Sequence, residues 1–193
     1  MYLKGNKHLA ILVLFLGDYK RQFYLREISR LTKIPLKTTQ TLVYNLETAK
    51  ILKSAIVGKN KYFRLNLDSI QAKLYILQAE IHRTLLFMEK YPLFKIFLNE
   101  VKMDTPLIVF GSFAEFKPDK DSDVDLLMIS KEKQNLPFYL LAYKIHEIKL
   151  SESSFIKSLE KQEALIKEIE ENHIILNNHS FYINIMWSYY GAR

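Results

Sequence analysis

Two aspartates separated by one residue have the types and spacing needed for metal chemistry. Asp123 and Asp125 open the run 123–129, in which apolar residues give strand character. Side chains two residues apart on a strand point to the same face, so the two carboxylates are predicted to lie side by side. Their mutual repulsion is relieved when a cation lies between them. Mg²⁺ suits such a pair, because it binds through one or two carboxylates together with substrate phosphates.

A second short apolar strand, residues 105–110, is predicted just before this pair. It ends at Gly111-Ser112, and ten residues, 113–122, separate that dipeptide from Asp123. A strand that ends in Gly-Ser offers backbone donors and a hydroxyl where a triphosphate could rest near the metal. The alternative is a surface loop followed by a strand that happens to carry acidic residues.

The spacing of these motifs resembles a known enzyme signature. Gly111-Ser112, a spacer and then Ser122-Asp123-Val124-Asp125-Leu126 resemble the signature of the DNA polymerase beta-like nucleotidyltransferase superfamily, in particular its minimal prokaryotic members. The resemblance covers about 25 residues. It implies that Asp123 and Asp125 bind Mg²⁺ (or Mn²⁺) and that Gly111 and Ser112 contact the phosphates of a nucleoside triphosphate. The implied reaction moves a nucleoside monophosphate to an acceptor and releases pyrophosphate.

A third carboxylate from a neighbouring strand usually completes the site in this superfamily. The candidate here is Glu147, in the strand-like run 144–150. Strand alternation puts His146 and Glu147 on opposite faces, so the strand register decides which of them reaches the pair. A lone acidic residue on an edge strand can also be simply solvated.

Two residues depart from the superfamily pattern. Its members commonly have a basic residue and then a glycine after Gly-Ser-x-Ala, where this chain has Glu115 and Phe116. An acid there opposes a triphosphate, and phenylalanine lacks the backbone freedom of glycine. Lys117 is the nucleotide-binding candidate from the same loop, and Lys120 adds positive charge. These departures leave open an inactive or nucleotide-sensing domain.

The basic charge of the chain lies in its first third. Residues 1–70 contain 13 Lys/Arg and 4 Asp/Glu, whereas residues 71–193 contain 15 and 17. This asymmetry is typical of a nucleic-acid-binding module attached to another domain. A basic surface that only aids solubility is the alternative.

The order of predicted elements in this basic segment resembles a winged helix-turn-helix over about 65 residues. A break at residues 32–35 separates two helices, and Gly58-Lys59-Asn60 joins two predicted strands. The resemblance implies that the helix from about residue 36 to residue 50 enters the major groove of double-stranded DNA and that the hairpin lies along the backbone or the minor groove. The implied DNA-binding residues are Lys37, Thr38, Thr39, Gln40, Lys59, Lys61 and Arg64. Winged helices that bind proteins or form dimers are the alternative.

The sequence therefore predicts an α+β protein of two domains. We expect a winged helix-turn-helix domain at residues 1–67, a connecting helix at 68–91 and, at 92–193, a nucleotidyltransferase-like domain with a mixed sheet flanked by helices. The connecting helix has an apolar stripe that could pair with a second copy, giving a homodimer, or pack against its own chain. The longest apolar run, residues 9–16, is too short to cross a membrane. The lack of cysteine is compatible with the reducing cytoplasm, where we expect the protein.

Two functions from different classes follow from these patterns. The first is a metal-dependent nucleotidyltransferase guided by a DNA-binding winged helix. The second is a DNA-binding transcriptional regulator whose nucleotidyltransferase-like domain is inactive or only senses a nucleotide. A toxin-like partner protein is a further hypothesis, because minimal nucleotidyltransferases often work beside a toxin.

Overall fold

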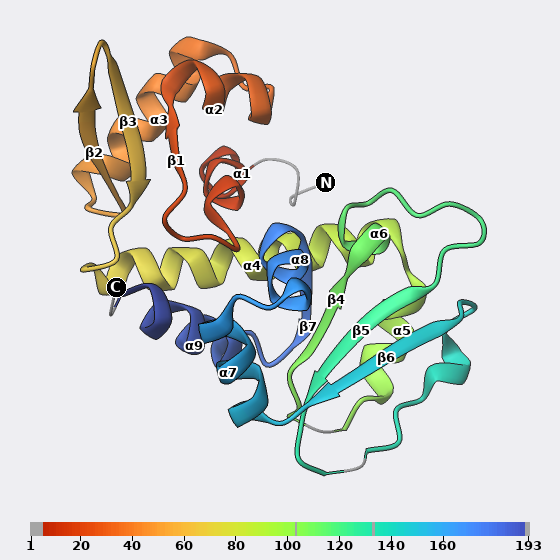
Figure 1. The fold of residues 1–193 in the computed structure, drawn as a ribbon. Coiled ribbons are helices and arrows are strands. Elements are labelled where there is room, and N and C mark those ends of the chain that lie inside the picture. The colour runs from red at the N-terminus through yellow and green to blue at the C-terminus, as the bar shows by residue number, and fades with distance from the viewer. Residues whose placement is uncertain (1–5, 103, 133, 192–193) are drawn as a thin grey trace. The chain divides into compact units, whose positions relative to one another are not determined.

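The computed structural model describes residues 6–102, 104–132 and 134–191 of the chain. These residues form two compact units (Figure 1). The first unit contains residues up to 82 together with residues from 183 onward, and the second contains residues 83–182. Two helices, α4 (Ile70–Lys90) and α9 (His179–Gly191), continue from one unit into the other.

The first unit combines three N-terminal helices with a three-stranded antiparallel sheet in the order β1-β3-β2. The helices pack on one another and on the sheet, burying apolar residues such as Ile28, Val43 and Phe63. The elements are α1 (Lys7–Leu12), the 3-10 helix η2 (Val13–Phe15), β1 (Gln22–Tyr24), α2 (Leu25–Thr32), α3 (Leu36–Thr48), β2 (Leu52–Val57) and β3 (Asn60–Leu65).

The predicted break between two helices lies between α2 and α3. Lys33, directly after α2, has φ +57°, and the hydroxyl of Ser29 donates to the carbonyl of Ile34. α3 then begins directly after Pro35. The predicted hairpin is also present, since β2 and β3 pair in register around a turn in which Gly58 has φ +61°.

The end of α9 belongs to the first unit through aromatic contacts. The rings of Trp187 and Tyr190 lie 5.8 and 5.4 Å from the ring of Tyr19, which is buried. The compact units therefore differ from the predicted boundaries at residues 67 and 91. The long helix α4 contributes to both units, and the last residues of the chain do not stay with the second.

The second unit is built on a mixed four-stranded sheet in the order β6-β5-β4-β7. β4 is antiparallel to both β5 and β7, whereas β6 is parallel to β5. The prediction of an α+β chain with a mixed sheet flanked by helices is confirmed for this unit. Its elements are α5 (Leu93–Glu100), β4 (Leu107–Phe110), α6 (Gly111–Ala114), β5 (Val124–Ile129), the 3-10 helix η3 (Phe138–Leu140), β6 (Ile145–Leu150), α7 (Glu152–Lys161), α8 (Ala164–Glu171) and β7 (His173–Asn177).

Alternation along the central strands gives the sheet two different faces. Val124, Leu126 and Met128 of β5 join an aromatic core formed mainly by α4, α5 and α6, with Phe87, Phe94 and Phe113 fully or almost fully buried. The intervening residues Asp125 and Leu127 point to the other face. A buried strand thus carries a carboxylate at its start, away from the aromatic core.

None of the helices in residues 6–102, 104–132 and 134–191 has both the length and the apolar character that crossing a lipid bilayer requires.

Candidate active site

The two aspartates of the sequence motif lie at the start of β5, next to β6. Asp125 is paired across the sheet with Phe110 of β4 and with His146 of β6, and Asp123 immediately precedes the strand. Lys144 Nζ lies 2.9 Å from Asp123 Oδ2, and His146 Nδ1 lies 3.0 Å from Asp125 Oδ1. Lys144 and His146 are two residues apart around the start of β6, so their side chains point to the same face of the sheet. Each of them contacts one of the two carboxylates.

The ammonium of Lys144 offsets part of the charge of the pair. The hydrogen bond to Asp123 and the negative charge of that carboxylate raise the pKa of Lys144 above its ordinary value. The Lys144 side chain is 82% exposed, so its contact with Asp123 can exchange readily with a competing cation from solvent. The carboxylates are therefore held in position without being sealed from a ligand.

Gly111 lies directly against Asp125. It has φ +66°, and a β-carbon built on it would lie 2.5 Å from Asp125 Oδ2, closer than any ordinary contact. Both the backbone conformation and the lack of space therefore require glycine at this position. Gly111 and Ser112 begin the short helix α6, so the structure brings the predicted phosphate-contacting dipeptide next to the carboxylate pair.

The loop after α6 keeps a glycine-like backbone without a glycine. Phe116 has φ +61°, which is uncommon for a bulky side chain. Its ring packs against Phe87 and Tyr91, with centroids 6.0 and 6.4 Å away, and Lys90 donates to its carbonyl. Aromatic packing therefore offsets the backbone cost at the position where the superfamily commonly has glycine.

The two charged residues that flank Phe116 are at the surface. Lys117, predicted to bind nucleotide, has a side chain that is 79% exposed, and its Nζ lies 3.8 Å from Glu115 Oε2. The acid at the departing position is thus partly neutralised by the lysine next in the loop. An exposed pair of this kind contributes little to stability.

The structure does not bring Glu147 to the aspartate pair. Glu147 is opposite Leu126 in the β5–β6 register, on the face that carries the aromatic core. Its Oε2 lies 3.1 Å from Lys149 Nζ, and its buried Oε1 has no hydrogen-bond partner among the residues that the structure describes. The position beside Asp125 belongs to His146, so the expectation of a third carboxylate there needs correction.

A further acid, Glu168 of α8, is electrostatically coupled to the site. Partial burial raises its pKa, and the negative charges of Asp125, Glu171 and Glu115 raise it further. These neighbouring carboxylates therefore disfavour the ionised form of Glu168. Nothing in the spacing of the sequence connects Glu168 with the motif, because α8 follows it by some forty residues.

Asp123 and Asp125 are the residues that could hold a metal ion. Among the described residues, no group of three or more His, Asp or Glu side chains is placed to hold one. Mg²⁺ does not need a complete protein cage, because it is often bound through one or two carboxylates, with substrate phosphates and water as the other ligands. The pair thus fits a magnesium ion that arrives together with a nucleotide.

The residues predicted to contact DNA differ in accessibility. Lys37 and Gln40 of α3, Lys59 at the hairpin turn and Arg64 of β3 are exposed, and Thr38 is half-buried. Thr39 is buried, and its hydroxyl lies 3.1 and 3.2 Å from the carbonyls of Ile34 and Pro35. The Thr39 hydroxyl therefore donates to the chain just before its own helix, and Thr39 is corrected from a DNA contact to a structural residue.

Lys61 is engaged inside the first unit. Its Nζ lies 2.8 Å from Glu47 Oε2 and about 5 Å from the ring centroids of Tyr44 and Phe63. Glu47 also accepts a hydrogen bond from Ser54. Burial alone would raise the pKa of Glu47, but the bonds from Lys61 and Ser54 outweigh it and hold that pKa below its ordinary value.

Comparison with known proteins agrees with the geometry of the second unit. Residues 95–181 match the family model described as polymerase beta, nucleotidyltransferase. Neither the curated proteins nor the solved structures include a match to the chain. The matched segment contains the whole sheet, with Gly111, Ser112, Asp123 and Asp125. This part of the chain is therefore similar to nucleotidyltransferase domains, which suggests nucleotidyltransferase activity.

Proposed function

We propose that the second unit transfers a nucleoside monophosphate from a nucleoside triphosphate to an acceptor hydroxyl, with release of pyrophosphate. The main observation is the contact between the Asp125 carboxylate and Gly111, with Asp123 on the same face. A carboxylate pair beside a glycine with no room for a side chain is suited to a metal–phosphate complex lying close to the backbone.

Asp123 and Asp125 would hold Mg²⁺ or Mn²⁺, which when bound would neutralise the phosphates and stabilise the entering and leaving oxygens. Gly111 keeps the approach to the backbone open. Lys117 and Lys120, both exposed on the loop, supply positive charge for the triphosphate. Lys144 and His146 hold the carboxylates side by side before the substrate arrives.

The test is label transfer from each of the four α-labelled triphosphates, with Mg²⁺ or Mn²⁺ and the full chain. We expect incorporation into a protein, nucleic-acid or small-molecule acceptor, reduced at least about 100-fold by Asp123→Asn or Asp125→Asn. Asp121→Asn is the matched control, because Asp121 is an exposed acid of the same loop outside the pair. Equal activity in Asp125→Asn and Asp121→Asn would contradict the proposal.

A second candidate function is a transcriptional regulator whose nucleotidyltransferase-like domain binds nucleotide without transferring it. Three observations favour it: an acid at Glu115, a phenylalanine held at φ +61° and a histidine in place of a third carboxylate. Calorimetry that detects Mg²⁺-dependent nucleotide binding, without label transfer to any acceptor, would support this function over the first.

For the first unit, we propose a winged helix-turn-helix that binds double-stranded DNA. The proposal is supported by the order of α1, β1, α2, α3, β2 and β3, by the short turn between α2 and α3 and by the exposed Lys37 and Gln40 on α3. Affinity for a duplex should fall steeply with salt, because cations that contact phosphates release counterions. A flat salt response of the full chain would contradict DNA binding by this unit.

A further inference from the structure

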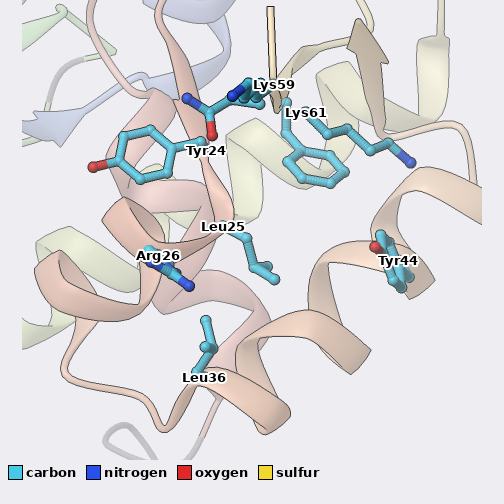
Figure 2. A pocket seen from close by; sticks show the side chains of 9 residues that line it. Tyr24, Leu25, Arg26, Leu36, Tyr44, Lys59 and Lys61 are labelled. Atoms are coloured by element: carbon cyan, nitrogen blue, oxygen red, sulfur yellow. The ribbon is translucent and has the colours of Figure 1, made fainter. Parts of the chain in front are cut away.

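A pocket inside the first unit lies between the start of α2, the exposed side of α3 and the turn of the β2–β3 hairpin (Figure 2). Its volume is about 570 Å³, within the range of sites that hold a small molecule or one group of a larger ligand. Figure 2 shows Lys59 on the hairpin side, Arg26 and Leu36 on the side of the helices, and Tyr44 on α3. Three separate elements thus surround one space.

One wall of this pocket is apolar and aromatic. Tyr44 is 40% exposed, with its ring 6.1 Å from that of the buried Phe63, and Leu36 is 43% exposed on the same helix. Lys61 Nζ lies 5.0 Å from the centroid of the Tyr44 ring, and the exposed part of the ring offers a flat surface to the pocket. Aromatic surfaces of this kind stack with nucleobases without strong sequence preference.

All charged residues that line the pocket are basic: Arg26, Lys59 and Lys61. Lys61 is paired with Glu47, whereas Arg26 and Lys59 form no ion pair within residues 6–102, 104–132 and 134–191. Two exposed cations beside an aromatic surface match a ligand that carries phosphate next to a planar ring. That combination is a nucleotide.

The charge around the pocket favours a strand over a free nucleotide. The first 70 residues have an excess of nine positive charges, and Arg64 is a further exposed cation on the hairpin, whereas Lys53 is paired with Asp68. Positive charge that extends well past one phosphate is expected for a polyanion. We propose that this pocket takes an unpaired nucleotide of a nucleic-acid strand, with its base on Tyr44 and Leu36 and its phosphates on Arg26 and Lys59.

This inference rests on the proposed nucleic-acid binding of the first unit and adds a preference to it. A protein that only follows the backbone of a duplex has no use for an exposed aromatic wall. A pocket that accepts one unpaired base would direct the protein to duplex ends, overhangs or single-stranded segments.

The test is fluorescence anisotropy of the full chain with three probes at one salt concentration. They are a blunt DNA duplex, the same duplex with a short single-stranded overhang and a labelled mononucleotide. We expect the overhang probe to bind roughly 5- to 100-fold more tightly than the blunt duplex. The mononucleotide should bind far more weakly than either, and an RNA overhang of the same sequence should behave like the DNA overhang.

Matched variants assign the effect to the pocket. Tyr44→Ala should abolish the advantage of the overhang and leave blunt-duplex binding within about twofold, whereas Tyr44→Phe should keep it, because the ring remains. Tyr75→Ala is the control, since Tyr75 is 37% exposed on α4 and outside this pocket. Replacing both Arg26 and Lys59 with Gln should weaken binding of the overhang probe and flatten its salt dependence. Circular dichroism and thermal unfolding of each variant check that it is folded.

The outcomes separate this inference from the proposed DNA binding. Equal affinity for blunt and overhang probes, or an equal loss on both with Tyr44→Ala, would overturn the pocket assignment while duplex binding stands. If the mononucleotide binds as tightly as the overhang probe, the pocket binds a free nucleotide, and the proposal that it binds a nucleotide within a nucleic-acid strand is overturned. If no oligonucleotide binds, both proposals fail.

Discussion

The β4–β5 hairpin of the second unit and the β2–β3 hairpin of the first each have a glycine with positive φ, but the surroundings of the two glycines differ. Gly111 leaves no room for a side chain, because the carboxylate of Asp125 fills the space, whereas Gly58 has nothing within 4 Å of the position of a β-carbon. Gly58 serves only a turn. Gly111 provides both the positive φ of a turn and the space that the Asp125 carboxylate occupies.

The charges near the two hairpins differ in the same way. Beside β5, each carboxylate has a close partner, Lys144 Nζ at 2.9 Å from Asp123 and His146 Nδ1 at 3.0 Å from Asp125, whereas Lys59 and Arg64 on the other hairpin are exposed cations. Chemistry that depends on closely placed atoms should fail abruptly when one atom is displaced. Binding that depends on a field of charge should weaken gradually.

The largest expected effect comes from substituting the two glycines. Gly111→Ala should lower label transfer about 100-fold, because displacing Asp125 by a fraction of an ångström disturbs the proposed site. It should also lower the free energy of unfolding by about 2 kcal/mol. Gly58→Ala should cost only the backbone term, about 1 kcal/mol, and leave transfer unchanged.

Urea unfolding and label transfer, measured on the same two variants, check these values. If both variants lose transfer equally, the close contact of Gly111 with Asp125 has no special role.

His146→Asp tests whether the second unit lacks only a third carboxylate. The new acid would lie opposite Asp125 and should tighten Mg²⁺ binding in the presence of nucleotide, by about tenfold, since each added charged ligand strengthens a site. Glu147→Gln should leave metal affinity unchanged, because Glu147 lies on the other face. Calorimetric titration of both variants with Mg²⁺, in the presence of nucleotide, measures these affinities. Weaker metal binding in His146→Asp, or a loss in Glu147→Gln, would contradict the register argument.

In the first unit, adjacent residues of α3 should respond in opposite ways. Thr39→Val removes a buried hydroxyl that donates to the carbonyls before the helix, so we expect a loss of about 1 kcal/mol in stability with little change in DNA affinity. Gln40→Ala should leave stability nearly unchanged and weaken DNA binding. Thermal unfolding measures the stability of both variants, and fluorescence anisotropy measures their DNA affinity. A loss of DNA affinity in Thr39→Val with a loss of stability in Gln40→Ala would contradict these assignments.

The smallest effects are pH-dependent and have opposite sign in the two units. The lowered pKa of Glu47 means that its ionised form stabilises the first unit above about pH 4.5 and that this stability is lost as pH falls through the folded-state pKa. The raised pKa of Glu168 means that ionisation opposes folding. The second unit should therefore gain stability as pH falls from above that pKa toward 4.5.

Urea unfolding at neutral pH checks these signs on two Gln variants. Glu47→Gln should lower stability by about 1 kcal/mol, and Glu168→Gln should raise it. The same sign for both would contradict the electrostatic account.

Local patterns of the sequence were enough to predict much of the fold. Helical spacing predicted α2, α3 and α4, and the β2–β3 hairpin followed from its turn residues. The break between α7 and α8 was not predicted; it lies at Gln162, which takes φ +53°. β7 was not recognised, because a buried apolar run near the end of a chain gives no strand alternation.

The candidate site was predictable only where it depends on neighbours in sequence. Gly111, Asp123 and Asp125 lie within one hairpin, so their spacing indicates their proximity. The partners His146 and Lys144 depend on the register between β5 and β6, which no local pattern specifies when both faces of the strand carry polar residues. Glu168 reaches the site from a helix later in the chain, through tertiary packing alone.

The uptake of Mn²⁺ by the full chain, with and without a non-hydrolysable triphosphate, tests the central claim most directly. Electron paramagnetic resonance of the free ion measures it. We expect saturable, nucleotide-dependent uptake in the parent and in Asp121→Asn, and its loss in Asp123→Asn and Asp125→Asn. Uptake that survives in both of the last two variants, or no uptake in the parent, would contradict the assignment of Asp123 and Asp125 as the metal and nucleotide site.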